Sequence, residues 1–299
     1  MAHFAVTEDR LPSRHRLRRA LKGLHPGAPV VIMLHGLKYD PDQPVNDPHR
    51  HIFALNPDPG HKRAVSWPRR LGLRGPHALA LGYGWRARGS IWRAHRRAGQ
   101  TAAALTRLIA RIATLNPDRP IHIVAHSLGA RVALRALEGL PAHTVHRIIL
   151  IAAAAFEGEL RRALTTPAGS TAEIINIRSR ANWIFDLLLW LALPHWGATL
   201  GRGRVRRPNL LDLAIDDAAT AARLADAGYD LTEATPRICH WSAYLRRDAC
   251  AFYRALLHRP GATPLPYLRR LLDQPRSQPA LPFPPRLPFW TGHSPKERP

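Results

Sequence analysis

Short apolar runs recur along the chain, separated by stretches whose apolar residues follow a helical spacing. The first run, residues 30–34, is continuous. Similar runs follow at residues 78–81, 121–125, 147–151 and 174–177. Continuous runs of this length are typical of strands that are buried on both faces of a sheet. We therefore predict five strands of one sheet that is covered on both sides.

The segments between these runs favour helices. Residues 100–115 carry the clearest pattern, because apolar side chains recur at i, i+3, i+4 and i+7 from Leu105. A second helix is predicted over residues 131–137, with Gly139 just past its end. Strands that alternate with helices imply a parallel sheet with right-handed crossovers.

The remaining elements have weaker patterns. Residues 39–76 are rich in Pro, Asp and His, which predicts a long loop with a short strand at residues 64–67. Residues 236–239 are predicted as the last strand and residues 243–257 as the last helix.

Composition divides the chain into one domain and two appendages. Residues 1–27 are basic and end in the helix-breaking run His-Pro-Gly, which predicts a basic N-terminal arm with one amphipathic helix. Residues 28–258 form the predicted α/β domain. Within it, residues 183–209 form an apolar, lid-like insertion, although spacing alone does not separate a lid from a buried core helix. Residues 259–299 are basic and crowded with proline, which predicts an extended or disordered tail.

The charge balance is strongly positive, with 44 basic and 21 acidic residues and a net charge of +23. Such a charge attracts anionic membrane surfaces, nucleic acids and acidic substrates. The basic residues are scattered and no RNA-binding signature accompanies them, so nucleic acid is not expected as a partner, whereas an anionic membrane surface stays a candidate. Two cysteines and no apolar run of signal-peptide type near the start predict a cytoplasmic protein.

One segment carries a catalytic pattern. Residues 125–130, AHSLGA, lie between a predicted strand and a predicted helix. A nucleophile elbow needs this context, with small residues two positions before and after the nucleophile, and here these are Ala125 and Gly129. We therefore predict Ser127 as a nucleophile, with the N–H of Leu128 facing the negative charge that develops on a carbonyl oxygen.

Three features together resemble the α/β-hydrolase superfamily over residues 28–257: the run LHGL at residues 34–37, the elbow around Ser127 and the terminal run CHW. Within it, the pattern is similar to an uncharacterised bacterial group of serine esterases and lipases. The resemblance implies an α/β-hydrolase fold, with a mostly parallel central sheet flanked by helices on both faces. It also implies that the backbone N–H of Leu37 is the second donor of an oxyanion hole, in a loop shaped by His35 and Gly36.

The order of a hydrolase triad is serine, acid, histidine. His240 follows the predicted last strand and precedes a helix, so we predict it as the base. The acid is expected after residues 174–177. We predict Asp186, with Asn182, one helical turn earlier, as the alternative that orients His240 without a charge. More distant candidates are Asp212, Asp216 and Asp217.

The predicted activity is that of a carboxylic ester hydrolase that cleaves an ester or thioester with an apolar acyl group through an acyl-enzyme on Ser127. No cofactor or metal is expected, because His122 and His126 lie on or beside a strand and not at zinc-ligand spacing on a helix. Two alternatives stay open: an acyltransferase with the same triad, and a basic, non-catalytic protein that binds anionic lipid or nucleic acid. The sequence does not define the substrate, the acyl length or the oligomeric state.

Overall fold

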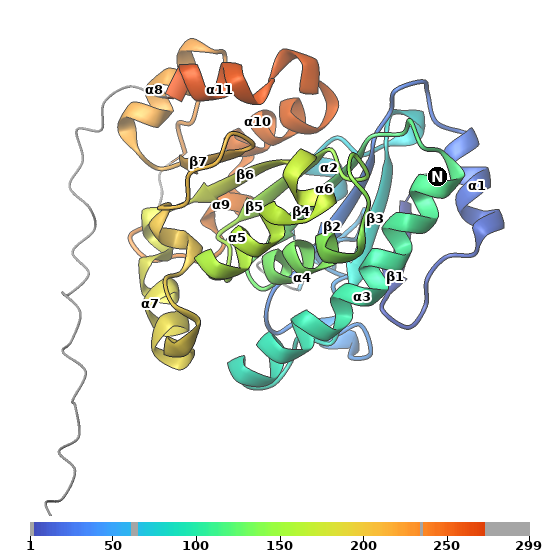
Figure 1. Ribbon diagram of the computed structural model, residues 1–299, viewed down its shortest axis with the longest axis horizontal. Helices are drawn as coiled ribbons and strands as arrows, with labels where there is room; N and C mark the ends of the chain where they lie inside the picture. The colour runs from blue at the N-terminus through green and yellow to red at the C-terminus, as the bar shows by residue number, and fades with distance from the viewer. Residues whose placement is uncertain (1–2, 61–64, 234–235, 273–299) are drawn as a thin grey trace, which may run out of the picture.

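The computed structural model describes residues 3–60, 65–233 and 236–272. Within them, one sheet has the strand order β1-β3-β2-β4-β5-β6-β7, and all neighbouring strands are parallel (Figure 1). The strands are β1 (His3–Thr7), β2 (Val30–Leu34), β3 (Leu79–Gly84), β4 (Ile121–His126), β5 (Arg147–Ile151), β6 (Glu173–Arg178) and β7 (Leu210–Ala214). The predicted α/β class and parallel sheet are confirmed.

Helices cover both faces of the sheet. The α-helices are α1 (Arg14–Lys22), α2 (Trp67–Arg70), α3 (Ile91–Leu115), α4 (Gly129–Ala136), α5 (Glu157–Thr165), α6 (Pro167–Thr171), α7 (Trp183–Ala192), α8 (Ala218–Asp226), α9 (Ser242–Leu245), α10 (Arg247–His258) and α11 (Leu265–Leu272). Short 3-10 helices are η1 (Pro44–Asn46), η2 (Gly75–His77), η3 (Leu137–Gly139), η4 (Arg180–Asn182), η5 (Pro194–Trp196), η6 (Leu200–Arg202) and η7 (Pro260–Ala262).

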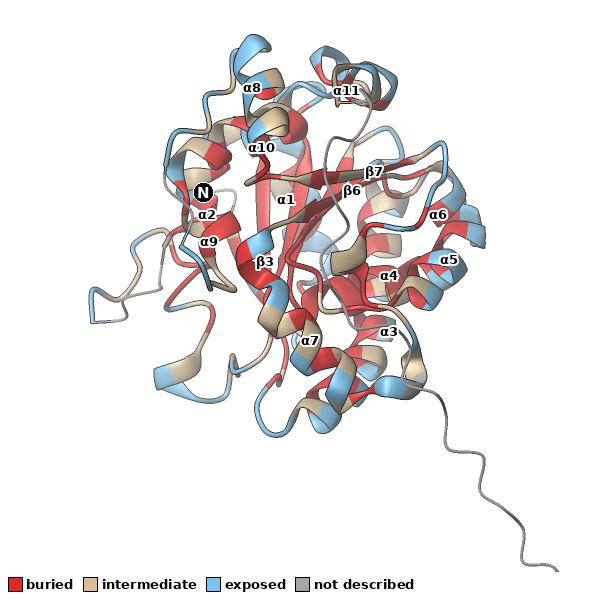
Figure 2. Cartoon of the chain, turned by 90° about the vertical axis from the view of Figure 1, so that its left-hand side faces the viewer, coloured by how far each residue is buried: buried red, intermediate tan, exposed pale blue. Residues whose placement is uncertain are grey.

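Each face of the sheet packs a separate apolar core. Along β2, Val30, Ile32 and Leu34 join the core under α1, α3, α4, α5 and α6, whereas Val31 and Met33 join the core under α2, α8, α9, α10 and α11. Side chains alternate between the faces of a strand, so a strand with helices on both faces must be apolar throughout. Figure 2 shows the central strands as buried along their length.

The five predicted strands match β2 to β6, and the predicted helix at residues 100–115 lies within α3, while two weaker strand predictions were wrong. Residues 236–239 form no strand, and the last strand is β7, which the sequence pattern hid because Asp212 interrupts its apolar run. Asp212 is tolerated there because its Oδ1 accepts a hydrogen bond of 2.7 Å from Asn176 Nδ2 on β6. In the segment 64–67, Ser66 caps α2 instead of forming a strand, and α3 begins at Ile91, well before residue 100.

The domain boundaries also differ from those expected. Residues 3–7, expected in a basic arm, form the edge strand β1, which pairs with β3. Beyond residue 258, the chain continues as η7 and α11, whose Leu265 and Leu268 are buried in the core under α10. The rest of the expected tail, residues 273–299, lies outside the described residues. No helix in the described ranges is long and apolar enough to cross a membrane.

Candidate active site

Ser127 lies at a sharp turn between β4 and α4. Its φ is 55°, in the left-handed region that non-glycine residues rarely adopt. Three backbone hydrogen bonds hold it there: its N–H donates to the Ile151 carbonyl oxygen at 3.1 Å, and its own carbonyl oxygen accepts from Ala130 and Ala154 at 3.0 Å each. This is the strained strand-turn-helix geometry of a nucleophile elbow.

Two glycines allow the end of β2 to pack against this turn. A Cβ on Gly129 would lie 2.8 Å from the carbonyl oxygens of Leu34 and His35. A Cβ on Gly36 would lie 2.5 Å from the Cβ of Ser127. Both distances are too short for real carbon contacts, so glycine is required at each position. The elbow therefore lies beside the loop that follows β2 and carries Leu37.

The segment before α9 places His240 against Ser127. The Ser127 hydroxyl donates to His240 Nε2, with 2.8 Å between Oγ and Nε2. Two contacts hold the segment: Cys239 N–H donates to the Ala181 carbonyl oxygen at 2.9 Å, and His126 Nε2–H donates to the His240 carbonyl oxygen at 3.1 Å. Burial, followed by the proximity of His126, lowers the pKa of His240 well below its ordinary value. The imidazole is therefore neutral at pH 7 and able to accept a proton.

Asn182, and not Asp186, contacts the other side of this imidazole. His240 Nδ1–H donates to Asn182 Oδ1 at 2.6 Å. Asp186 lies one step further away, where its Oδ2 accepts a hydrogen bond of 3.1 Å from Asn182 Nδ2. The structure thus brings Ser127, His240, Asn182 and Asp186 into one chain of hydrogen bonds, in which the residue predicted as the triad acid does not touch the base.

Asp186 sets which way the Asn182 amide points. An amide offers one acceptor oxygen and one donor nitrogen. With Nδ2 directed to the Asp186 carboxylate, Oδ1 faces Nδ1 of His240, and this fixes the proton on Nδ1 and leaves Nε2 free to accept from serine. Burial raises the pKa of Asp186 to about 7, against opposing effects of Asn182 and Arg178.

His35 is buried against the loop that carries Leu37, and both of its ring nitrogens are hydrogen-bonded. Its Nδ1–H donates to the Gly36 carbonyl oxygen at 2.9 Å, and its Nε2 accepts from the Trp85 backbone N–H at 3.0 Å. The Trp85 indole stacks on the ring. Burial lowers the pKa of His35 to about 3, so it stays neutral and shapes the loop before Leu37. Within the described part of the chain, the N–H groups of Leu37 and Leu128 donate to no other residue.

The distant acidic candidates have structural roles near the site. Asp216 Oδ2 accepts from Ser179 Oγ at 2.8 Å and from Ala181 N–H at 3.3 Å, which holds η4 and therefore Asn182 in place. Asp217 caps α8 through the Thr220 N–H. The pattern of residues alone did not identify Asp216 or His126 as supports, because both act through contacts with residues distant in sequence.

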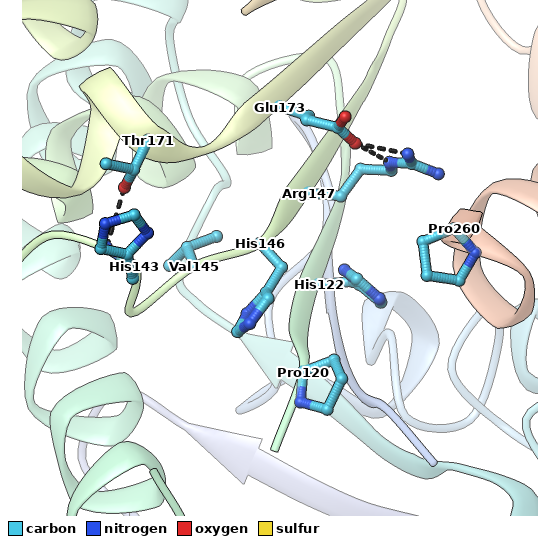
Figure 3. A pocket seen from close by; sticks show the side chains of 9 residues that line it. All are labelled: Pro120, His122, His143, Val145, His146, Arg147, Thr171, Glu173 and Pro260. Atoms are coloured by element: carbon cyan, nitrogen blue, oxygen red, sulfur yellow. Dashed lines mark hydrogen bonds and ion pairs between the residues drawn. The ribbon is translucent and has the colours of Figure 1, made fainter. Parts of the chain in front are cut away.

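A separate pocket of about 220 Å³ lies at the opposite edge of the sheet, where β4, β5 and β6 begin (Figure 3). His122 and Arg147 line it, with Pro120 and Pro260 nearby. Arg147 is fully buried and pairs with Glu173. Neither ring nitrogen of His122 has a hydrogen-bond partner among the described residues. This pocket shares no residue with the hydrogen-bonded chain at Ser127. In the described residues, no cluster of three or more His, Cys, Asp or Glu side chains could hold a metal ion.

Part of the chain, including the turn at Ser127, matches a known protein family. The model of a family described as alpha/beta hydrolases of unknown function (DUF900) matches residues 24–158, which include β2 and the elbow. The chain has the fold of an α/β-hydrolase. The matched region ends before the segments that carry Asn182 and His240, so the positions of these two residues rest on the structure alone.

Comparisons with curated proteins and with solved structures do not extend the family match. No curated protein matches this chain. Among solved structures, the crystal structure of TT1662 from Thermus thermophilus is 14% identical, with a TM-score of 0.38. The alignment covers 84% of this chain and 92% of that one.

Proposed function

We propose that this α/β-hydrolase is a serine hydrolase that cleaves an ester or thioester with an apolar acyl group. One observation carries the proposal: Ser127 sits at φ 55° with its Oγ 2.8 Å from Nε2 of a neutral, half-buried histidine. A strained backbone at a non-glycine residue is costly, and such strain clusters at positions that serve chemistry. A hydroxyl paired with a neutral imidazole is the standard arrangement for activating serine as a nucleophile.

The proposed reaction has two steps. In the first, Ser127 Oγ bonds to the carbonyl carbon while its proton passes to His240 Nε2, and His240 then donates this proton to the departing alcohol or thiol as the acyl bond breaks. In the second, water attacks the acyl-enzyme and gives a proton to His240, which then donates it to Ser127 Oγ as the bond between Oγ and the acyl carbon breaks and the carboxylic acid is released. The N–H groups of Leu37 and Leu128 stabilise the oxyanion in both steps.

Asn182 and Asp186 act in series in this proposal. Replacing the triad aspartate of a serine protease by asparagine lowers kcat by about 10⁴-fold because the imidazole takes the wrong tautomer. Here, Asp186 holds Asn182 with its oxygen towards His240, so the correct tautomer is kept. The imidazolium that forms during attack lacks a carboxylate in direct contact. Asp186 acts on it through the orientation of the Asn182 amide and, where Asp186 is ionised, above its pKa of about 7, through a more distant negative charge.

Apolar groups around the base support an apolar acyl substrate. The Phe185 ring on α7 lies 4.8 Å from the His240 ring, measured between centroids. Trp241 follows His240 directly and contacts both rings. Such walls exclude water from the acyl-enzyme and favour hydrocarbon over charged acyl groups. The role of residues 183–209 as a lid remains part of this proposal.

The test is covalent labelling with a fluorophosphonate probe, followed by mass spectrometry of the labelled peptide. We expect one adduct on Ser127 in the full chain and none in Ser127→Ala. A labelled wild type that hydrolyses short p-nitrophenyl esters supports hydrolysis, and one that acts only with an added alcohol acceptor supports an acyltransferase. Absence of both labelling and turnover supports the rival proposal of a non-catalytic binding protein. The observation that favours this rival is Asn182, which contacts His240 where a catalytic triad has a carboxylate.

A further inference from the structure

Helix α7 and the first turn of α3 expose large apolar side chains. Trp92 on α3 is 59% exposed, and Leu188 and Leu191 on α7 are 56% and 57% exposed. Trp183, at the start of α7, is also exposed. The Trp92 indole N–H donates to the Ala192 carbonyl oxygen at 2.8 Å, so the two helices meet there. We call these four residues the α7–α3 face.

The α7–α3 face is not the core-facing side of α7. Leu189 and Leu193 already bury the inner side of the helix against Phe156. The one ionisable side chain of α7, Asp186, is also buried and is hydrogen-bonded to Asn182. Helix α7 is therefore apolar on its outer side as well. A surface helix of a globular protein normally carries polar residues on its solvent-exposed side. The exposed apolar side of α7 therefore favours contact with a membrane or with another apolar surface.

The surroundings of the α7–α3 face are positively charged. Arg88, Arg93 and Arg96 are exposed within one helical turn of Trp92 in sequence. Residues 86–99 contain no acidic residue. Exposed tryptophan and leucine flanked by arginine are the composition of segments that lie in the interface of an anionic membrane. A protein partner would require acidic side chains matched to these arginines, whereas anionic headgroups provide negative charge over the whole surface.

We propose that the α7–α3 face binds the surface of a bilayer that contains anionic phospholipid. Trp92, Trp183, Leu188 and Leu191 enter the headgroup boundary, and the arginines of α3 contact lipid phosphates. Phe185, on the same helix, contacts the His240 ring. Binding therefore places the hydrogen-bonded chain at Ser127 next to the lipid surface. The docking itself does not depend on catalysis, and its test needs no substrate.

The experiment is sedimentation of the full chain with vesicles of phosphatidylcholine alone and with vesicles that contain phosphatidylglycerol. We expect binding to the phosphatidylglycerol vesicles that weakens with added salt. The double variant Leu188→Glu/Leu191→Glu should bind at least tenfold more weakly at unchanged melting temperature, because both side chains are exposed. The matched control is Tyr267→Glu on α11, which is exposed at the other end of the molecule from α7 (Figures 1 and 2).

A second pair of variants tests the charges. Arg93→Glu/Arg96→Glu should lose the preference for phosphatidylglycerol, whereas Arg161→Glu/Arg162→Glu on α5, with the same change in net charge, should keep most of it. Equal losses in both double variants would mean that net charge alone drives binding, and the proposal fails.

Three other results overturn the proposal. Unchanged vesicle binding by Leu188→Glu/Leu191→Glu places the contact elsewhere. A dimer that dissociates in the same variant, without vesicle binding by the wild type, assigns the α7–α3 face to a second copy of the chain. Vesicle binding that appears only after deletion of residues 273–299 assigns the face to that segment. Retained vesicle binding by Ser127→Ala keeps this test separate from the proposed hydrolase activity.

Discussion

His122 and His126 lie at opposite ends of the same strand, β4, and differ in what surrounds them. Both are buried, and burial lowers their pKa values, to about 3 for His122 and about 4 for His126. His126 donates a hydrogen bond to the backbone of His240 and contacts its ring. His122 faces the pocket at the opposite edge of the sheet and makes no hydrogen bond with a described residue (Figure 3).

The difference comes from the direction of the strands. Where parallel strands end, loops from several of them converge, and here they bring together Ser127, Asn182 and His240. Where the strands begin, Arg147 on β5 connects the sheet to helix α10. It pairs with Glu173 on β6 and donates to the Leu256 carbonyl oxygen of α10 at 2.7 Å. The residue type and the burial of a histidine therefore do not indicate its role, whereas its position at the carboxyl ends or the amino ends of the strands does. The two edges should respond differently to substitution.

The largest effect is expected at the elbow. Ser127→Ala should lower kcat for p-nitrophenyl esters by about 10⁶-fold, on the precedent of serine proteases, because the nucleophile is lost. Its melting temperature should rise or stay unchanged, since Ala leaves the same backbone turn. Measurable turnover at the wild-type rate by the purified variant would show that another residue is the nucleophile.

The next effect concerns the residues that orient His240. Asn182→Leu should lower kcat by about 10⁴-fold with little change in KM, because Nδ1–H loses its acceptor. Asp186→Asn should cost far less, about tenfold, because an amide oxygen at position 186 can still accept from Asn182. Steady-state kinetics compare the two. If Asp186→Asn is the more damaging substitution, the charge of Asp186, and not the orientation of Asn182, supports the reaction.

At the opposite edge, Arg147→Met should reduce stability and leave kcat unchanged. The buried carbonyl oxygens of Leu256 and Thr263 lose their donor, at a cost of about 1–3 kcal/mol for each unsatisfied group, whereas Glu173, whose side chain is 30% exposed, can be solvated by water. Urea unfolding of the variant measures the loss, and esterase activity of the folded fraction is the control. A kcat that falls with stability intact would show that the two edges are coupled.

Asn182→Asp should move the pH profile. The base must be neutral, so kcat/KM in the wild type is lost as pH falls through the lowered pKa of His240. A carboxylate in contact with Nδ1 stabilises the imidazolium and raises this pKa by about 1–3 units, which moves the acid limb to higher pH. The profile of kcat/KM against pH is the measurement, and an unmoved limb would mean that position 182 carries no charge next to His240.

The smallest effect is expected from His122. Its folded pKa of about 3 lies below the ordinary 6.5, so the unfolded chain binds the proton first and stability falls as pH drops from about 6.5 towards 3. The slope is about 1.4 kcal/mol per pH unit for one such histidine. His122→Leu should therefore lose less stability than wild type between pH 6.5 and 5, at unchanged kcat. Equal slopes in urea unfolding would show that His122 is solvated in the native state.

The sequence by itself determined the parallel sheet and the position of the elbow. A strand buried on both faces must be continuously apolar, so β2, β4 and β5 were readable from local pattern, and Ser127 lies at a fixed offset from one of them. His240 was found from its order in the chain relative to Ser127, although the strand expected before it does not exist.

Only the tertiary structure decided the partner of His240. Asn182 and Asp186 are one helical turn apart, so no local pattern distinguishes which of them reaches the imidazole. The outcome depends on where η4 is held, and Asp216, which follows β7, supplies that contact from far along the chain. The same holds for β7 and for the outer side of α7. Strand β7 is defined by its pairing with β6, and the side of α7 that stays exposed is defined by the packing of the opposite side against Phe156. Such packing between distant segments is fixed only when the whole chain is folded.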